Sequence, residues 1–442
     1  MKKLKPIFFL IIVILTFFLL SKINFKQDLI WNLKNLFHPK IVFHLKKGYI
    51  LYIHDFKNKI TIEKGRETLI TSSKGREFNF TTFKNDFFKK NGPKFFLELN
   101  ENNLIIITGT GLISFADLKN YNLKKDLKII RSNLRELVSL EQIVNNPGFI
   151  LNMKIFNDEI YVSYINELRK NCFNTTFVMG KLNFKKINFQ KIYSPKDCID
   201  TKNPYGEFYI LEAGGAIELI DENKIFVSTG TFRFRDLAQS EESIFGKILL
   251  IDLSKNLQKV ISMGHRNIQG MYYDNKKEIL FFIDHGPQGG DEINLDLNPL
   301  DNIIENYGWP IASYGEHYGG KNEKNKKKYK KAPLLKSHKL YSFKEPLKYF
   351  VPSIAPSDLL FVPEKFDPKF KNNIYISSLG FTNEGSRRSI HSFFYNDKES
   401  KLSNHEIIKL DDRIRDIEYN KELNSIILSL EKSGSIGILQ KL

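Results

Sequence analysis

Cysteine is scarce in this sequence. Its 442 residues include two cysteines, Cys172 and Cys198, and no Cys/His spacing that is typical of a zinc site. In an oxidising compartment the two thiols could pair, and closing a loop of about 27 residues would stabilise the fold by roughly 3–4 kcal/mol. Two free thiols are the alternative.

Acidic residues are missing from the start of the chain, where none precedes Asp28. Three lysines lie within the first five residues, and an apolar run follows over residues 7–20. A basic end followed by roughly 14 apolar residues is typical of a secretory signal, whereas a full membrane span needs about 20. No small-x-small cleavage site follows, which favours an uncleaved anchor. The sequence predicts a signal peptide or signal anchor over residues 1–25, with the rest of the chain periplasmic or otherwise extracytoplasmic and tethered to the inner membrane.

Nucleic-acid-binding patterns of the RNP, zinc-finger or helix-turn-helix type are also missing, although the formal net charge is +17. Five basic residues flank the N-terminal apolar run. Seven lysines crowd into residues 321–331, a segment predicted to be one solvated loop. Because much of the positive charge is confined to these two segments, we expect no nucleic-acid partner.

Helical periodicity is weak, and a helix is plausible only around residues 124–142. From Ile41 onward, short apolar runs alternate with turn residues, for example at 49–53, 95–99, 104–108, 159–164, 224–228, 247–251, 278–283, 373–377 and 425–429. Many short strands indicate a sandwich, barrel or propeller. A turn–charge–apolar cassette recurs at intervals of about 50–65 residues, which favours an all-β propeller.

The most specific part of the sequence is an ordered set of polar, glycine-rich motifs. Glycine turns permit close backbone approach, and exposed carbonyls in such turns could face a cation. Turns that require glycine for conformational reasons would explain any one of these motifs but not the ordered set. The set is Gly264-His-Arg-Asn-Ile-Gln-Gly270, Asp284-His-Gly-Pro-Gln-Gly-Gly-Asp-Glu-Ile-Asn294, Asn306-Tyr-Gly-Trp-Pro310 and Ser313-Tyr-Gly-Glu-His-Tyr318.

This set resembles the signature of the PQQ-dependent soluble aldose dehydrogenases, the glucose/sorbosone dehydrogenase family. The resemblance covers roughly residues 92–442 and includes segments 146–150, 161–164, 246–249, 353–357 and 413–416. It implies a six-bladed β-propeller that binds PQQ and calcium at the mouth of its channel and oxidises a sugar hydroxyl by hydride transfer to the quinone. We therefore expect a signal or anchor segment over residues 1–25, a β-rich N-terminal extension over 26–91 and the propeller over 92–442.

The resemblance also implies roles for individual residues. PQQ carries three carboxylates, for which guanidinium groups are natural partners. Alternation in Arg413-Ile-Arg415 independently puts both guanidinium groups on one strand face; an exposed pair is the alternative. The implied contacts are Arg266 and Asn267 to the quinone, Arg413 and Arg415 to its carboxylates, and the backbone carbonyls of Gly286 and Pro287 to calcium.

The sequence departs from the family where the catalytic histidine belongs, because Glu212 occupies that position. The other departures are Ala216 for an arginine, Gly230-Thr231 for a Gly-Asp turn and Gly380 for a lysine. One reading makes Glu212 the base, acting beside Arg266; its carboxylate should then face the channel mouth with no lysine or arginine neutralising it. The other is a catalytically silent, membrane-anchored propeller that binds a saccharide or a protein. Expected partners are a sugar, the membrane and an unidentified electron acceptor.

Overall fold

The computed structural model describes residues 38–85, 87–88, 94–118, 126–204, 206–368, 372–380 and 387–442. The signal or anchor segment predicted over residues 1–25 lies outside these ranges. Within them, no helix is long and apolar enough to cross a membrane. The chain divides into two compact units, Met1–Lys57 and Asn58–Leu442, each of which is described by itself.

The described part of the first unit is helix α3 (Pro39–Asp55). The strand predicted at residues 49–53 is wrong, because this run continues the helix. Val42, Ile50 and Ile53 recur at helical spacing along one face, and a proline occupies the first helical position, where no backbone N–H is required.

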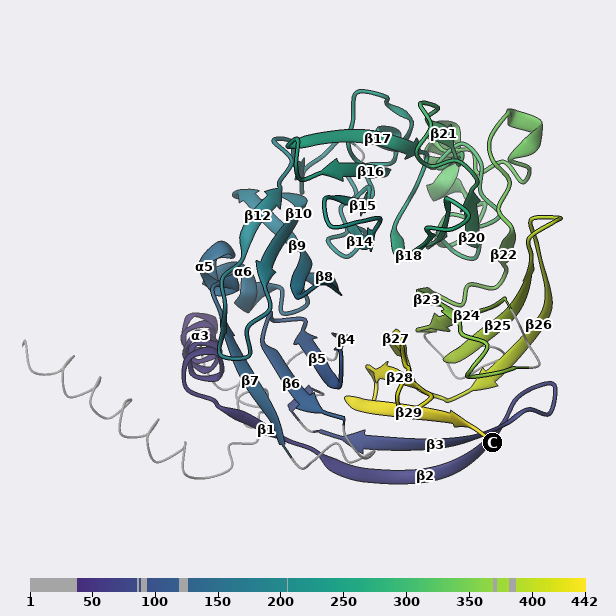
Figure 1. Ribbon diagram of the computed structural model, residues 1–442. Helices are drawn as coiled ribbons and strands as arrows, with labels where there is room; N and C mark the ends of the chain where they lie inside the picture. The colour runs from purple at the N-terminus through teal and green to yellow at the C-terminus, as the bar shows by residue number, and fades with distance from the viewer. Residues whose placement is uncertain are drawn as a thin grey trace, which may run out of the picture. The chain divides into compact units, whose positions relative to one another are not determined.

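The second unit consists of six antiparallel sheets arranged as blades around a common axis (Figure 1). Blades one to three are built from β4 (Phe95–Asn100), β5 (Asn103–Thr108), β6 (Ile113–Asp117) and β7 (Asp126–Ser132); β8 (Ile150–Phe156), β9 (Glu159–Arg169), β10 (Cys172–Lys181) and β12 (Gln190–Tyr193); and β14 (Gly214–Leu219), β15 (Lys224–Thr229), β16 (Lys247–Asp252) and β17 (Leu257–Met263). Small additions are β11 (Lys186–Ile187) on β7, β13 (Ile199–Asp200) on β10 and β21 (Glu305–Asn306) on β17.

Blades four to six complete the ring and confirm the predicted all-β, six-bladed propeller. They are built from β18 (Ile268–Asp274), β19 (Ile279–Asp284), β20 (Asp291–Asp296) and β22 (Lys348–Phe350); β23 (Pro356–Val362), β24 (Asn373–Ser378), β25 (Ser389–Asn396) and β26 (Lys401–Lys409); and β27 (Ile414–Asn420), β28 (Ser425–Leu430), β29 (Ser435–Lys441) and β3 (Glu77–Lys84), with β2 (Glu63–Thr71) beyond β3. Short helices lie in the connections: α5 (Leu134–Leu137), α6 (Leu140–Asn145), η3 (Arg235–Gln239), η4 (Glu323–Asn325), α7 (Lys326–Lys331) and η5 (Lys339–Tyr341).

The first strand of each blade is innermost. Strands β4, β8, β14, β18, β23 and β27 contact one another in cyclic order around the axis. Residues at the ends of these strands therefore lie near one another although they are far apart in sequence.

The ring is closed by strands from both ends of the described propeller unit. Strand β3 pairs with β29 from Lys84 opposite Ser435 to Phe78 opposite Lys441. Strand β1 (Lys59–Thr61) pairs with β7 at the outer edge of the first blade. The segment expected to be a β-rich extension thus contributes strands to two blades.

Apolar side chains fill the space between neighbouring blades, as the contact between blades four and five illustrates. The ring centroid of Phe281 lies 4.9 Å from that of Phe361 and 4.8 Å from that of Tyr395. All three belong to one cluster built from both sheets. Each blade is therefore stabilised mainly by burying its faces against its neighbours.

Two local predictions need correction. The segment around 124–142 forms strand β7 before it forms short helices, because Leu127 and Ile129 lie two positions apart and pack into the same first-blade cluster. The lysine-rich segment 321–331 is not one solvated loop but forms η4 and α7. It is anchored by the buried Asn325, whose amide donates a hydrogen bond of 3.0 Å to the carbonyl of Tyr318.

The predicted disulfide is confirmed. Cys172 opens β10, and Cys198 immediately precedes β13, which pairs with β10. The two sulfurs are bonded, and the Cα atoms lie 5.3 Å apart. The bond ties the second blade to the segment that leads toward Glu212.

Removing this bond should lower the stability of the propeller. We expect Cys198→Ser to reduce the free energy of unfolding by about 3–4 kcal/mol, because the unfolded chain gains the freedom of the opened loop. Urea unfolding of parent and variant measures the difference. The parent treated with reductant serves as control and should match the variant; equal stability of oxidised parent and variant would contradict the expectation.

Candidate functional site

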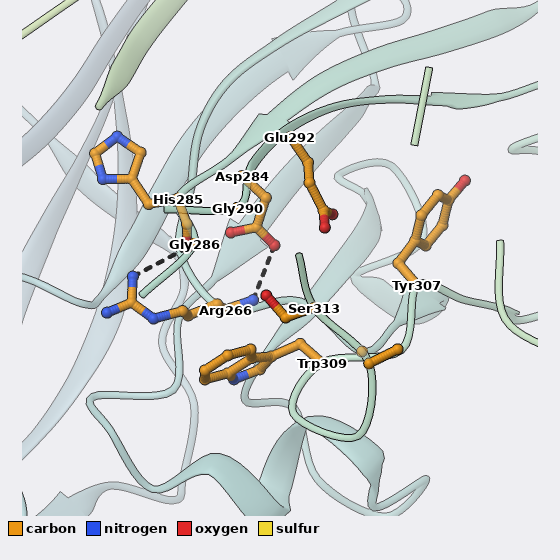
Figure 2. A pocket seen from close by; sticks show the side chains of 11 residues that line it. Arg266, Asp284, His285, Gly286, Gly290, Glu292, Tyr307, Trp309 and Ser313 are labelled. Carbon is orange, nitrogen blue, oxygen red and sulfur yellow. Dashed lines mark hydrogen bonds between the residues drawn. The ribbon is translucent and has the colours of Figure 1, made fainter. Parts of the chain in front are cut away.

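The turn that carries Arg266 and Asn267 is fixed by Asp284. This carboxylate, at the end of β19, accepts a backbone N–H bond from Arg266 at 2.9 Å (Figure 2). It accepts a second from Asn267 at 2.7 Å. Burial raises the pKa of Asp284 to about 6, although these bonds and the Arg266 charge act in the opposite direction. Gly264 is required just before the turn, because a Cβ there would lie 2.3 Å from Oδ1 of Asn306.

The Arg266 guanidinium is held by three groups. Its Nη2 lies 2.6 Å from Oε2 of Glu212, and its Nη1 donates to the carbonyl of His285 at 3.0 Å. It also lies over the Trp309 ring, 5.6 Å from the centroid. Burial alone would lower the pKa of Arg266, but the Glu212 charge raises it above its usual value, so the guanidinium stays positive.

Glu212 is not an unpaired carboxylate, so that prediction is wrong. Its Oε1 accepts hydrogen bonds from the Thr231 hydroxyl at 2.7 Å and the Arg233 backbone N–H at 3.2 Å. Its Oε2 faces the guanidinium of Arg266 and lies 3.7 Å from Nε of Arg233. Glu212 is 1 % exposed and acts as a buried counter-ion of Arg266.

The turn after β15 explains why Glu212 is paired. Phe232 donates its N–H to the carbonyl of Glu212 at 2.8 Å, and its φ of 48° reverses the chain beside that residue. Arg233 follows with φ 71°. The sequence places Thr231 and Arg233 about twenty positions from Glu212, and the turn is what brings them to its carboxylate.

Arg413 and Arg415 share one carboxylate that the sequence did not reveal. Nη2 of Arg413 lies 3.2 Å from Oε2 of Glu431, and Nε of Arg415 donates to Oε1 at 2.5 Å. Nη1 of Arg413 also donates to the carbonyl of Gly380 at 3.1 Å. Burial alone would raise the pKa of Glu431, but Arg415 and Arg413 lower it below its usual value. The two guanidinium groups therefore lie on one side of the strand, around an ionised carboxylate, rather than as an exposed pair.

A short hydrogen-bond path joins the two arginine groups. Asn267 Oδ1 accepts from Nε2 of Gln269 at 3.2 Å, and Gln269 Oε1 accepts from Nη1 of Arg415 at 3.4 Å. The structure thus brings Arg266, Asn267 and Arg415 to the same end of the inner strands. Nothing in their sequence spacing indicates this path.

A lysine from another position lies near the arginine pair. Burial lowers the pKa of Lys94 to about 7; the Arg415 charge lowers it further and the Glu431 charge opposes the shift. Lys94 directly precedes β4, and its Nζ lies 5.4 Å from the Phe96 ring centroid. An amine is therefore close to the arginines although Gly380 replaces the expected lysine.

The Gly286–Pro287 turn presents backbone oxygens. In the part of the chain that the structure describes, neither carbonyl accepts a hydrogen bond. A Cβ at Gly286 would lie 2.3 Å from the carbonyl oxygens of Gly289 and Gly290, so only glycine allows these oxygens to approach. The N–H of Gly286 donates to Asp291 at 3.0 Å, which holds the turn in place.

Two cavities border Arg266. The smaller, of about 10 Å³, is large enough for roughly one water; Figure 2 shows the side chains around it, among them Glu292, Tyr307 and Ser313. The larger has a volume of about 240 Å³ and is lined by Glu207, Arg233, Arg235, Arg266, Pro287, Trp309, His317, Tyr318 and Lys328. Glu212 lines neither cavity.

Comparison with known families assigns the chain. The profile of the Glucose / Sorbosone dehydrogenase family matches residues 140–438. The chain belongs to this family. The aldose sugar dehydrogenase YliI of Escherichia coli is 26% identical over 208 residues, covering 44% of this chain and 50% of the relative. An uncharacterised Synechocystis protein is 26% identical over 215 residues, 46% of this chain and 47% of the relative. The matched part thus spans about half the length of these curated relatives.

Solved structures of the family share the fold. The soluble aldose sugar dehydrogenase of Escherichia coli in its apo form superposes with a TM-score of 0.61 at 18% identity, covering 86% of this chain and 99% of that one. The PQQ-bound aldose sugar dehydrogenase of Streptomyces coelicolor gives 0.53 at 15% identity, covering 87% and 99%.

Removing the Glu212 charge should destabilise the glucose/sorbosone dehydrogenase fold. We expect Glu212→Gln to lower the free energy of unfolding by about 3–5 kcal/mol, because the buried Arg266 would lose its counter-ion. Urea unfolding measures the change. The exposed Glu222→Gln is the matched control and should leave stability unchanged. Equal stability of the two variants would rule out the counter-ion role.

Proposed function

We propose that the protein is a PQQ- and calcium-dependent dehydrogenase that oxidises a sugar hydroxyl. The observation that carries this proposal is the path from Asn267 through Gln269 to Arg415 at one end of the inner strands, directly beside the turn that carries Arg266. These residues are far apart in the sequence, and only the fold brings them together. Their chemistry matches a flat, tricarboxylate cofactor, because guanidinium groups pair with carboxylates in fixed geometry.

The described residues fit PQQ. Among the described residues, Arg413 and Arg415 gather two guanidinium groups around the carboxylate of Glu431, a donor set that suits an anionic ligand. Lys94 adds an amine that PQQ carboxylates would keep protonated. Arg266 and Asn267 would hold the quinone end. When bound, PQQ would supply the acceptor for the hydride from the sugar carbon.

The Gly286–Pro287 turn fits calcium, which binds oxygen ligands, including backbone carbonyls. The carbonyls of Gly286 and Pro287 accept no hydrogen bond in the described structure and would be its ligands from this chain. The Asp291 carboxylate would keep the turn in place, since it accepts the N–H groups of Gly286, Ile354 and Ala355 at 2.8–3.0 Å.

Proton acceptance needs a group other than Glu212, and His317 is the histidine that lines the larger cavity. Its Nε2 lies 2.8 Å from the carbonyl of Ala332, which can only accept, so Nε2 carries the ring proton. Burial lowers the pKa of His317, with the Ala332 bond acting in the opposite direction, so the ring is neutral at pH 7. Nδ1 then keeps the lone pair that would take the proton of the sugar hydroxyl.

The competing function is a catalytically silent propeller that binds a saccharide or a protein. One observation favours it: Glu212, at the position of the family's histidine, is buried and ion-paired. Either function would operate outside the cytoplasm, and the disulfide agrees with an oxidising compartment. Tethering through residues 1–25 and an electron acceptor of unknown identity belong to the same proposal.

Reconstitution tests the cofactor site. The full-length protein is mixed with PQQ and calcium, desalted, and assayed for retained quinone absorbance. Arg415→Gln should weaken PQQ binding by about 10–100-fold, the worth of one charge-assisted hydrogen bond. Arg66→Gln, an exposed arginine on β2, is the control and should bind like the parent. Absence of retained PQQ in the parent would refute the cofactor and leave the silent propeller.

Activity tests the proton acceptor. If the reconstituted parent oxidises an aldose, His317→Gln should lower kcat by about 10²–10⁴-fold, the usual contribution of a general base. PQQ binding should stay unchanged, because His317 lies outside the arginine groups. A variant as fast as the parent would exclude His317, and bound PQQ without oxidation in the parent would favour the silent propeller.

A further inference from the structure

The larger cavity is rich in positive charge for a sugar site. Its described lining includes Arg233, Arg235, Arg266 and Lys328, with Glu207 as the single carboxylate. Its volume of about 240 Å³ lies below the roughly 300–1,000 Å³ of drug-sized sites, which suits one small ligand. A neutral monosaccharide needs hydrogen-bonding partners but does not need this excess of cations.

The charges form two groups with the same composition. Glu207 pairs with Arg235 at 2.5 Å and with Lys328 at 2.6 Å, and those two charges lower its pKa although burial would raise it. In the second group, Glu212 faces Arg266 at 2.6 Å and Arg233 at 3.7 Å. Among the described residues, four positive side chains thus face these two carboxylates. The charges of Asp284 and Asp291 also act on Arg266, so the cations in excess over the lining carboxylate Glu207 are Arg233, Arg235 and Lys328.

Arg233 is the cation best placed to meet a ligand. Its guanidinium carbon lies 4.6 Å from the Tyr209 ring centroid and 5.4 Å from that of Tyr318, so two aromatic faces orient it. Its Nε is buried without a hydrogen-bond acceptor among the described residues, and its only ion pair there is the long contact to Glu212. The left-handed φ of 71° at this arginine is unusual for a long side chain, and strained backbone of this kind is typical of ligand-binding positions.

Trp309 supplies a second unpaired donor. It is 5 % exposed, lines the cavity, and its Nε1–H finds no acceptor in the described part of the chain. A buried donor without a partner is costly unless a ligand or water satisfies it. The cavity therefore presents unsatisfied donors and an excess of cations, together with aromatic rings suited to the face of a sugar.

We propose that this cavity binds a sugar that carries an anionic group, a carboxylate or a phosphate, with the anion held by Arg233. The inference deepens the proposed function by naming its substrate class, and it rests on that function only where oxidation is concerned. The sugar ring lies against Trp309 and the anion lies between Arg233 and Lys328. The hydroxyl to be oxidised then faces Arg266 and His317.

Binding without cofactor separates this inference from the dehydrogenase proposal. Calorimetric titration of the full-length protein, in the absence of PQQ, compares glucuronate, glucose 6-phosphate and glucose. At least one anionic sugar should bind about ten times more tightly than glucose, and the preference should shrink as ionic strength rises. Preference for glucuronate alone identifies a carboxylate site, and preference for glucose 6-phosphate alone identifies a phosphate site.

Charge-removing variants complete the test. Arg233→Gln should abolish the preference, a loss of about ten-fold for the anionic sugar, while affinity for glucose changes little. Lys328→Gln, on the outer helix α7, should reduce it without affecting folding, and Arg66→Gln should leave it intact. The inference would be overturned if the parent bound glucose, glucuronate and glucose 6-phosphate with equal affinity. It would also be overturned if Arg233→Gln weakened the binding of all three sugars equally. Retained preference without PQQ binding would refute only the dehydrogenase proposal.

Discussion

The pairing of β3 with β29 is the interaction on which the rest of the propeller depends. Seven consecutive residue pairs join a strand near the start of the described propeller unit to the last strand of the chain. Without this pairing the sixth blade would end at an open edge, and the ring of inner strands would have no fixed circumference. Arg266 and Arg415 belong to inner strands or their entry turns in different blades. The hydrogen bond from Arg415 to Gln269 joins two different blades, so it exists only in the closed ring.

Buried ion pairs then determine what the site can do. Two of the guanidinium groups at this end of the propeller are held by buried carboxylates, Arg266 by Glu212 and Arg415 by Glu431. A buried charge requires such a partner, because desolvation would otherwise exceed any gain from packing. The carboxylates therefore orient the arginines while leaving an excess of positive charge for ligands.

Glu212 and the turn that follows β15 form one unit of this arrangement. Glu212 is buried, and the turn at Thr231–Arg233 supplies its hydrogen bonds. The same turn carries Arg233 to the wall of the larger cavity, between two tyrosines. The pairing of Glu212 and the placement of Arg233 at the cavity wall thus depend on the same turn.

The sequence alone determined the family and the all-β propeller, because glycine turns, alternating strands and motif order are local properties of the chain. It left open whether the two cysteines pair, and the structure shows that they do. The sequence also identified Arg266, Asn267, Arg413 and Arg415 as candidates, through a resemblance. Only the tertiary structure decided that Glu212 is ion-paired and that Glu431 and Lys94 accompany the arginines. It also decided that Lys328 lines a cavity instead of belonging to a solvated loop. Charge pairing and burial depend on which blades and turns meet across the ring, and that distance information is absent from local sequence patterns.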